Sequence, residues 1–190
     1  MDERFAPYLE LLFRWNPVAG LTAFRNRETA YSKGVIPSLE ARTLLPDKGA
    51  VLDIGAGGGI PAVPLATVKP GLTWVLCEPA AKKSQFLREA ARVLSLSLEI
   101  RECTVEEFLS LSPGARFHAA TVRGVRLRKG LVKRVGEALV PGGALLVWTA
   151  GDAAARLRGW LDALGWARSE HLLGQAGQVI IIGRVPRGTI

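Results

Sequence analysis

The segment LDIGAGGGIPAVPLA, residues 52–66, places four glycines in five positions between two apolar runs. Glycine loses more backbone freedom on folding than any other residue, so this density is unfavourable inside a strand or a helix. The segment therefore predicts a tight turn between a strand and a helix. Because glycine has no Cβ, the backbone of such a turn can approach a ligand closely.

Strand-like and helix-like patterns alternate through the rest of the chain. Apolar runs predict strands at 50–54, 73–78, 97–101, 117–123, 144–149 and 178–185. Helical patterns lie between them at about 61–68, 80–95, 126–139 and 153–164, and PGG and LGW turns follow the last two. This alternation predicts an α/β fold, a mostly parallel sheet with helices on both faces. The last segment, WARSEHLLGQAGQVIIIGRV, predicts a hairpin that makes the final strand antiparallel.

Two further helical patterns, at about 3–15 and 28–45, precede the first strand and are joined by NPVAGLTAFRN. Residues 1–48 are therefore expected to form an N-terminal helical cap on a main domain at 49–190, within one compact unit. Trp15 is expected to pack the cap against the domain, and Trp74 and Trp148 are expected in the core. Pro37 is expected to kink or restart the second helix unless it lies in the first turn.

The spacing of the glycines indicates the class of ligand. In an open parallel sheet, ligands bind beyond the carboxyl ends of the strands, where the turn after the first strand lies. A dinucleotide fingerprint, G-x-G-x-x-G, needs a third glycine where this chain has Ile60. The chain instead has D-x-G-x-G-x-G from Asp53 to Gly59, which resembles motif I of the Rossmann-like class I S-adenosylmethionine-dependent methyltransferases.

An acidic residue at the end of the second predicted strand supports an adenosine ligand. Glu78 is placed to accept hydrogen bonds from both ribose hydroxyls. A nicotinamide enzyme uses the same type of acid, so an oxidoreductase stays open as an alternative. The C-terminal hairpin favours the methyltransferase, because class I methyltransferases end in this way and simple dehydrogenase domains generally do not.

The loop after the fourth predicted strand, TVRGVRLRKG, bears on the acceptor. It has neither the Asn/Asp-Pro-Pro-aromatic motif of adenine amino-group methyltransferases nor the cysteine nucleophile that pyrimidine C5 methylation needs. With no base or nucleophile in evidence, the loop suits an acceptor that is already nucleophilic, such as N7 of guanine. Catalysis can then depend on alignment of the reacting atoms.

Charge and composition limit the kinds of partner that the protein can bind. The net charge is +8, and residues 109–136 hold seven Lys/Arg residues and no acid. This stretch is either a surface for a polyanion or a solvated helix face. Two cysteines and two histidines lack metal-ligand spacing, so reduced thiols and no metal are expected. Without a secretory leader or an apolar run of membrane-spanning length, the expectation is a cytoplasmic protein that binds no membrane.

A family resemblance covers nearly the whole chain, most clearly residues 10–150. The matching segments, in order, are WNPVAGLTAFRN, LDIGAGGGIPAVPLA, EPAAKKSQFLREAARVL, RECTVEEF, ATVRG and LVPGGALLVW. They resemble the glucose-inhibited division protein B family, the RsmG-type methyltransferases. The resemblance implies methyl transfer from S-adenosylmethionine, with S-adenosylhomocysteine as product, to N7 of a guanine in 16S ribosomal RNA. The implied partner is this small-subunit RNA or the ribosomal particle, and a monomer is expected.

The resemblance also assigns site residues. It places cofactor contacts at Gly55, Ile60, Val105, Glu106 and Arg123. Together with motif I and the ribose acid, the predicted cofactor-binding set is Asp53, Gly55, Gly57, Gly59, Ile60, Glu78, Val105, Glu106 and Arg123. The predicted RNA contacts, from the basic stretch, are Arg123, Arg126, Arg128 and Lys129. No catalytic residue is assigned.

Some of these positions also have structural interpretations. Val105 and Glu106 are expected to start a short helix that Thr104 and Glu107 cap. Lys82 and Lys83 are expected to be solvated rather than functional.

The chain departs from the family pattern at several acceptor-side positions. Gly20 begins the segment where the family usually has Asn-Leu-Thr, and Gly34 and Pro37 stand in the helix that usually carries a His and an Asp. Ala150 precedes Gly151 where a Lys-Gly pair is usual. The alternatives are therefore a methyltransferase that acts on another RNA or a small molecule, and a non-catalytic protein that binds the cofactor or RNA.

Overall fold

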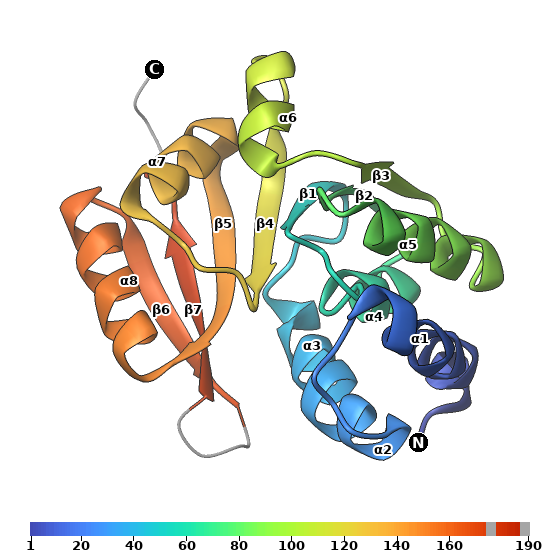
Figure 1. Cartoon of the computed structure of the whole chain (residues 1–190). Helices are drawn as coiled ribbons and strands as arrows, with labels where there is room; N and C mark the ends of the chain where they lie inside the picture. The colour runs from blue at the N-terminus through green and yellow to red at the C-terminus, as the bar shows by residue number, and fades with distance from the viewer. Residues whose placement is uncertain (174–177, 187–190) are drawn as a thin grey trace.

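The computed structural model describes residues 1–173 and 178–186 and contains one seven-stranded sheet (Figure 1). The strands are β1 Gly49–Ile54, β2 Leu72–Cys77, β3 Leu98–Arg101, β4 Phe117–Arg123, β5 Leu139–Ala150, β6 Ala167–Leu172 and β7 Gln178–Arg184. Their order across the sheet is β3-β2-β1-β4-β5-β7-β6. β1 to β5 are mutually parallel, and β7 is antiparallel to both β5 and β6. The predicted antiparallel final strand is confirmed, while the hairpin connection at 174–177 lies outside the described residues.

Helices cover both faces of this sheet, as predicted (Figure 1). They are α1 Ala6–Ala19, α2 Arg27–Ala30, α3 Ile36–Glu40, α4 Ala62–Val68, α5 Ala81–Val93, α6 Val105–Leu111, α7 Lys129–Ala138 and α8 Gly151–Ala163. Successive strand residues point to opposite faces, so Val51 joins the apolar cluster under α1, α4 and α5, and Leu52 the cluster under α6, α7 and α8. No helix in the described part of the chain is long and apolar enough to span a membrane.

The N-terminal helices pack directly on the first of these faces. Trp15 on α1 meets the ring of Phe86 on α5, with ring centroids 6.1 Å apart, so the expected contact between cap and domain is confirmed. Trp74 and Trp148 are buried, also as expected. The indole N–H of Trp148 donates to the carbonyl oxygen of Pro37 at 3.1 Å, which ties the N-terminal segment to β5.

The second predicted helix, 28–45, is interrupted. A π-helical turn, Tyr31–Val35, separates α2 from α3, and a short 3₁₀ turn, Ala41–Thr43, follows α3. Pro37 is the second residue of α3, and the helix therefore restarts in the way that the sequence predicted. The wide turn brings the carbonyl oxygens of Lys33 and Gly34 to a position where an arginine from β4 reaches them.

Two predicted boundaries are wrong. The PGG segment, 141–143, is not a turn but an irregular part of β5, where Gly142 has φ +78° and its N–H donates to the carbonyl oxygen of Val185. The helix predicted from residue 126 begins at Lys129, because Arg128 is extended, with φ −128° and ψ 149°. The stretch that precedes α7 is thus free to line the cavity described next.

Candidate functional site

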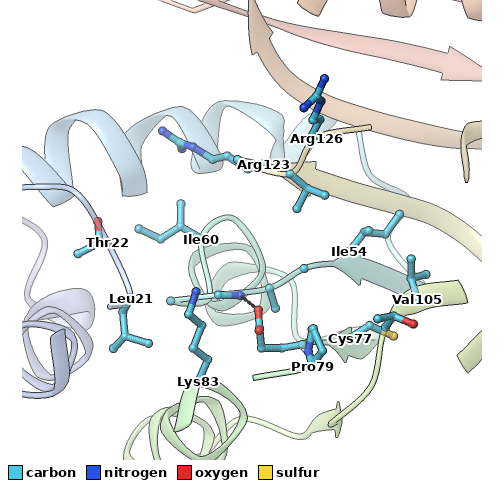
Figure 2. Close-up of a pocket in the computed structure, with 18 of the residues that line it drawn as sticks. Leu21, Thr22, Ile54, Ile60, Cys77, Pro79, Lys83, Val105, Arg123 and Arg126 are labelled. Carbon is cyan, nitrogen blue, oxygen red and sulfur yellow. Dashed lines mark hydrogen bonds between the residues drawn. The ribbon is translucent and has the colours of Figure 1, made fainter. Parts of the chain in front are cut away.

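A cavity of about 840 Å³ lies at the carboxyl ends of β1, β2 and β4, where the strand order reverses (Figure 2). The loop after β1, the end of β2, the start of α6 and the segment after β4 line it, together with residues 20–24. Its volume falls within the range of about 300–1,000 Å³ that is typical of small-molecule sites. We call it the main pocket.

The glycine loop forms one wall of the main pocket. The backbone N–H groups of Gly55 and Ala56 both donate to the carbonyl oxygen of Cys77, at 2.9 and 3.1 Å, which fixes the loop to the end of β2. Gly57 has φ +54°, and a Cβ at this position would meet only the Gly55 carbonyl oxygen, at 3.8 Å. The backbone of Gly57 therefore faces open space in the pocket, as the predicted approach of a ligand requires.

Glu78 follows β2 and closes this wall. It is buried, and its Oε2 accepts the Gly57 N–H at 2.8 Å while its Oε1 accepts the Ala80 N–H at 3.0 Å. These two bonds fix the orientation of the carboxylate without neutralising its charge. Each carboxylate oxygen has a further lone pair, so Glu78 retains the capacity to accept hydrogen bonds from a ligand.

The start of α6 forms the edge of the pocket nearest to β3. The Thr104 side chain accepts the Glu107 N–H at 3.2 Å, and Glu107 Oε2 accepts the Thr104 N–H at 2.9 Å, which confirms the predicted capping box. These hydrogen bonds lower the pKa of Glu107. The cap fixes where the helix begins, and so it holds Val105 and Glu106 against the pocket.

Arg123, at the end of β4, lies between the sheet and the N-terminal segment (Figure 2). Its guanidinium donates to the carbonyl oxygen of Gly34 at 3.1 Å and to that of Lys33 at 2.5 Å. Burial lowers its pKa. Within the described part of the chain no carboxylate pairs with it, so the pocket contains a fixed positive charge that an anionic group of a ligand can neutralise.

Asp53 lies beneath the pocket rather than in its wall. Its Oδ1 accepts the Thr121 hydroxyl at 2.6 Å, and its buried Oδ2 has no partner among the described residues. Burial raises the pKa of Asp53 to about 7. An oxygen without a partner is less costly on a protonated carboxyl than on a carboxylate, which is consistent with the raised pKa.

The structure brings most of the predicted site residues together. Those that line the main pocket are Gly55, Gly57, Ile60, Glu78, Val105, Glu106, Arg123, Arg126 and Arg128. Asp53, Gly59 and Lys129 do not line it. Gly59 has a packing reason instead, since a Cβ there would lie 2.6 Å from Val63 Cγ2 on α4.

Sequence reasoning missed two parts of the lining. Leu21 and Thr22, from the connection after α1, form the wall opposite Val105 (Figure 2). Phe24, from the same connection, also lines the pocket. Lys83, expected to be solvated, is half-buried and lines the pocket, whereas its neighbour Lys82 is exposed as expected. The matched segment WNPVAGLTAFRN marks the first part in the sequence, but nothing local indicates that it reaches the glycine loop.

The departures from the family pattern have distinct positions. Gly20 lines the main pocket. Gly34 lies behind it, where a Cβ would meet Ile60 Cδ1 at 2.9 Å and Phe24 Cε2 at 3.0 Å, so these two side chains fill the space that a larger residue would need. Ala150 is the N-cap residue of α8 and is not part of the described pocket lining.

Known proteins are similar to this chain in sequence, and others are similar to it in fold. Residues 1–159 match the family described as GidB, rRNA small subunit methyltransferase G. A ribosomal RNA small subunit methyltransferase G from Stenotrophomonas maltophilia is 34% identical over 93% of this chain and 89% of its own length. One from Halorhodospira halophila is 37% identical over 76% of this chain and 67% of its own length.

The fold also occurs in a solved Bacillus cereus O-methyltransferase in complex with SAH, with a TM-score of 0.67 and 17% identity over 94% of this chain and 90% of that one. At this identity the likeness shows the fold alone, whereas the sequence matches show the family. The chain belongs to the rRNA small subunit methyltransferase G family, whose members are S-adenosylmethionine-dependent methyltransferases.

Proposed function

We propose that this protein transfers the methyl group of S-adenosylmethionine to N7 of a guanine in 16S ribosomal RNA. One observation carries the proposal: a single pocket combines the glycine loop, Glu78 and Arg123 on one side with Arg126 and Arg128 on the other. The first side suits an adenosine-containing cofactor, and the second suits an RNA backbone. Family membership supplies the class of substrate.

The residues around the pocket fit the cofactor. The open backbone at Gly57 leaves room for it, Glu78 has the lone pairs for ribose hydroxyls, and Val105 with Glu106 edges the place of the adenine. Arg123 is the cation for the methionine carboxylate. When bound, S-adenosylmethionine supplies an electrophilic methyl group on a positively charged sulfur.

The contribution of the chain to the reaction is binding and orientation. Guanine N7 carries a free lone pair, so no proton has to be removed before the reaction. The carboxylates of the described lining are Glu78, which accepts two backbone N–H groups, and Glu106, at the start of α6, and both lie on the cofactor side. Phe24 is the pocket's one aromatic side chain among the described residues, and unstacked RNA bases commonly stack on such rings. Phe24 would thus hold the base beside the cofactor while water is excluded.

The proposal also covers the oligomeric state of the enzyme and the cellular compartment in which it acts. Residues 12–131 of a single chain are sufficient to form the main pocket, and the protein is proposed to act as a monomer. A substrate in the small ribosomal subunit places the proposed activity in the cytoplasm.

The direct test uses purified protein, labelled S-adenosylmethionine and small-subunit RNA that lacks the modification, both as naked RNA and as assembled particles. Nucleoside digestion and mass spectrometry should find 7-methylguanosine. Replacing the two pocket arginines, Arg126→Gln with Arg128→Gln, should raise the KM for RNA about tenfold, because two phosphate contacts are lost, and leave the Kd of the cofactor unchanged.

A matched control has the same change of charge away from the pocket: Lys82→Gln with Arg156→Gln, both exposed and on other helices. It should behave as the wild type. Absence of methylated nucleoside on both substrates, with intact cofactor binding, would overturn the proposal and favour a non-catalytic protein. A different methylated nucleoside would redirect the proposal to another acceptor.

A further inference from the structure

α6 and α7 lie on the sheet face opposite the N-terminal helices (Figure 1). Residues of these two helices and of the segment between α6 and β4 line a second groove. Its volume is about 560 Å³, and it shares no lining residue with the main pocket. Three basic side chains line it: Arg116, which precedes β4, and Lys133 and Arg134 on α7. We call it the α6–α7 groove.

The two arginines of this groove are held by neutral partners. Arg116 donates from one nitrogen, Nη1, to the carbonyl oxygens of Pro113 and Ala115 at 3.0 and 2.9 Å. Arg134 donates to the hydroxyl of Ser110 on α6. Neither forms an ion pair with a carboxylate in the part of the chain that the structure describes. Two fixed guanidinium groups therefore keep their charge and several free N–H donors, an arrangement suited to phosphate oxygens.

Lys133 adds a third charge that is only weakly compensated. Its Nζ lies 3.9 Å from Glu137 Oε1, and the two side chains are 67% and 65% exposed. Such an exposed pair contributes little and is readily exchanged for another anion. Glu137 is the one acidic residue in the described groove lining, so three positive charges face one negative charge.

α7 leads from the main pocket to this groove, because residues at its start line the first and later residues line the second. Arg126 and Arg128 line the main pocket, and α7 begins at the next residue, Lys129. The helix has ten residues, which corresponds to a length of about 15 Å. A nucleic-acid strand in a helix presents about four phosphates over this length. Basic residues thus accompany such a strand from the main pocket to the α6–α7 groove.

We propose that the α6–α7 groove binds the phosphate backbone of the RNA substrate at nucleotides next to the modified one, so that the RNA is held at two places on this enzyme. This inference rests on the proposed function, because it takes RNA as the substrate. An acidic protein segment is the less suitable occupant. Protein interfaces depend on buried aromatic and apolar anchors, and no aromatic residue occurs in the described groove lining.

The test compares full-length variants in methylation of small-subunit RNA at several salt concentrations. Replacing Lys133→Gln with Arg134→Gln should raise the KM for RNA about tenfold near 0.15 M salt. It should also reduce the slope of log affinity against log salt by about 1.5, since two phosphate contacts are lost. The kcat and the Kd of the cofactor should stay within twofold of the wild type. Lys82→Gln with Arg156→Gln is the charge-matched control.

A second variant is expected to change the KM for RNA in the opposite direction, and so it distinguishes an effect on binding from damage to the fold. Glu137→Gln removes the one carboxylate of the described groove lining and should lower the KM for RNA about two- to threefold. Loss of stability cannot produce tighter binding. Fluorescence anisotropy with labelled RNA measures the same affinities without turnover. It therefore tests RNA binding by the groove even if the wild type methylates no RNA. A wild type that methylates no RNA would refute the proposed function alone.

Two results overturn the inference. In the first, the lysine–arginine double variant has the same RNA affinity and salt slope as its control. In the second, its KM rises for the assembled small subunit and not for naked RNA, which would assign the groove to a ribosomal protein.

Discussion

The main pocket has two sides that are built in different ways. The cofactor side, residues 55–60 with Glu78 and the start of α6, consists of loops that leave the carboxyl ends of β1, β2 and β3. The acceptor side, residues 20–24 with 126–128, joins the connection after α1 to the segment after β4. Sheet pairing fixes the first side. On the second side, the Asn16 side chain at the end of α1 accepts the N–H groups of Leu21 and Thr22.

Arg123 connects the strand that precedes residues 126–128 to the helical segment that follows residues 20–24. It belongs to β4, and its hydrogen bonds reach residues that are 89 and 90 positions earlier in the chain. The cofactor side should therefore be sensitive to changes in the backbone of its loop. The acceptor side should be sensitive to the loss of this one guanidinium.

The largest expected effect is on the cofactor side. Gly57→Val places a branched side chain in the open space where the backbone faces the pocket, and it should weaken S-adenosylmethionine binding more than a hundredfold by calorimetry. Gly165→Val is the matched control, because Gly165 also has positive φ, +69°, with nothing within 4 Å of a built Cβ. Both variants should lose similar stability, and equal cofactor affinity in both would contradict the assignment.

Removal of the connecting arginine should come next. Arg123→Ala breaks two hydrogen bonds from a charged donor and removes the cation proposed for the methionine carboxylate. It should weaken cofactor binding and reduce kcat/KM for RNA about a hundredfold. Arg123→Lys keeps the charge but cannot span both carbonyl oxygens, so it should recover only part of the loss. Arg158→Ala, which removes a surface partner of Glu170, is the control. If the kcat/KM of Arg123→Ala for RNA were within threefold of the wild-type value, the acceptor side would not depend on this connection.

A smaller effect is expected for the ribose acid. Glu78→Gln leaves one acceptor oxygen where the Gly57 and Ala80 N–H groups need two, and it should weaken cofactor binding about tenfold. RNA affinity, measured by anisotropy, should not change. Glu102→Gln, on the surface beside Arg88, is the control, because it measures the effect of losing one carboxylate outside the pocket. A loss of RNA affinity in Glu78→Gln would mean that the two sides are not independent.

The smallest expected effect on cofactor and RNA binding concerns the carboxyl beneath the pocket, whose change is measured as stability. The pKa of Asp53 is raised to about 7 in the folded protein, whereas an unfolded aspartate titrates near ~4. The folded state therefore binds this proton more tightly, and the contribution of Asp53 to stability is full below about pH 4 and is lost as the pH rises to about 7.

Asp53→Asn removes this dependence. Chemical denaturation at several pH values should show a difference between wild type and variant that changes by at most ~1.4 kcal/mol per pH unit across that interval. Thr121→Val, which removes the hydroxyl that bonds Asp53 Oδ1, is a useful companion. Parallel stability profiles for wild type and Asp53→Asn would contradict the raised pKa.

Local patterns were sufficient to predict much of the fold. The seven strands, the antiparallel final strand and the capping box at Thr104 each follow from neighbouring residues, and all are present. The errors are also local in origin. The PGG segment lies at a register shift of β5 between the pairs Leu139–Phe117 and Ala144–Ala119, and backbone hydrogen bonds of Gly142 and Gly143 with Val185 hold it in the strand.

The site was predicted unevenly for the same reason. The residues of the cofactor side carry a motif because loops at strand ends have local conformational requirements, such as the positive φ of Gly57. No local sequence motif identifies Lys83 and Phe24 as pocket residues. Their position in the pocket depends on how α5 and the connection after α1 pack beside the glycine loop.

The sequence by itself determined the α/β alternation, the class of cofactor and the family, since these depend on residue spacing along one strand, one turn or one helix. Only the tertiary structure decided that Arg123 meets the π-helical turn, that Phe24 and Ile60 occupy the space beside Gly34, and that Arg116 joins Lys133 and Arg134 in one groove. These contacts join residues far apart in the chain. Their geometry is set by the packing of helices on the sheet, for which no local pattern exists.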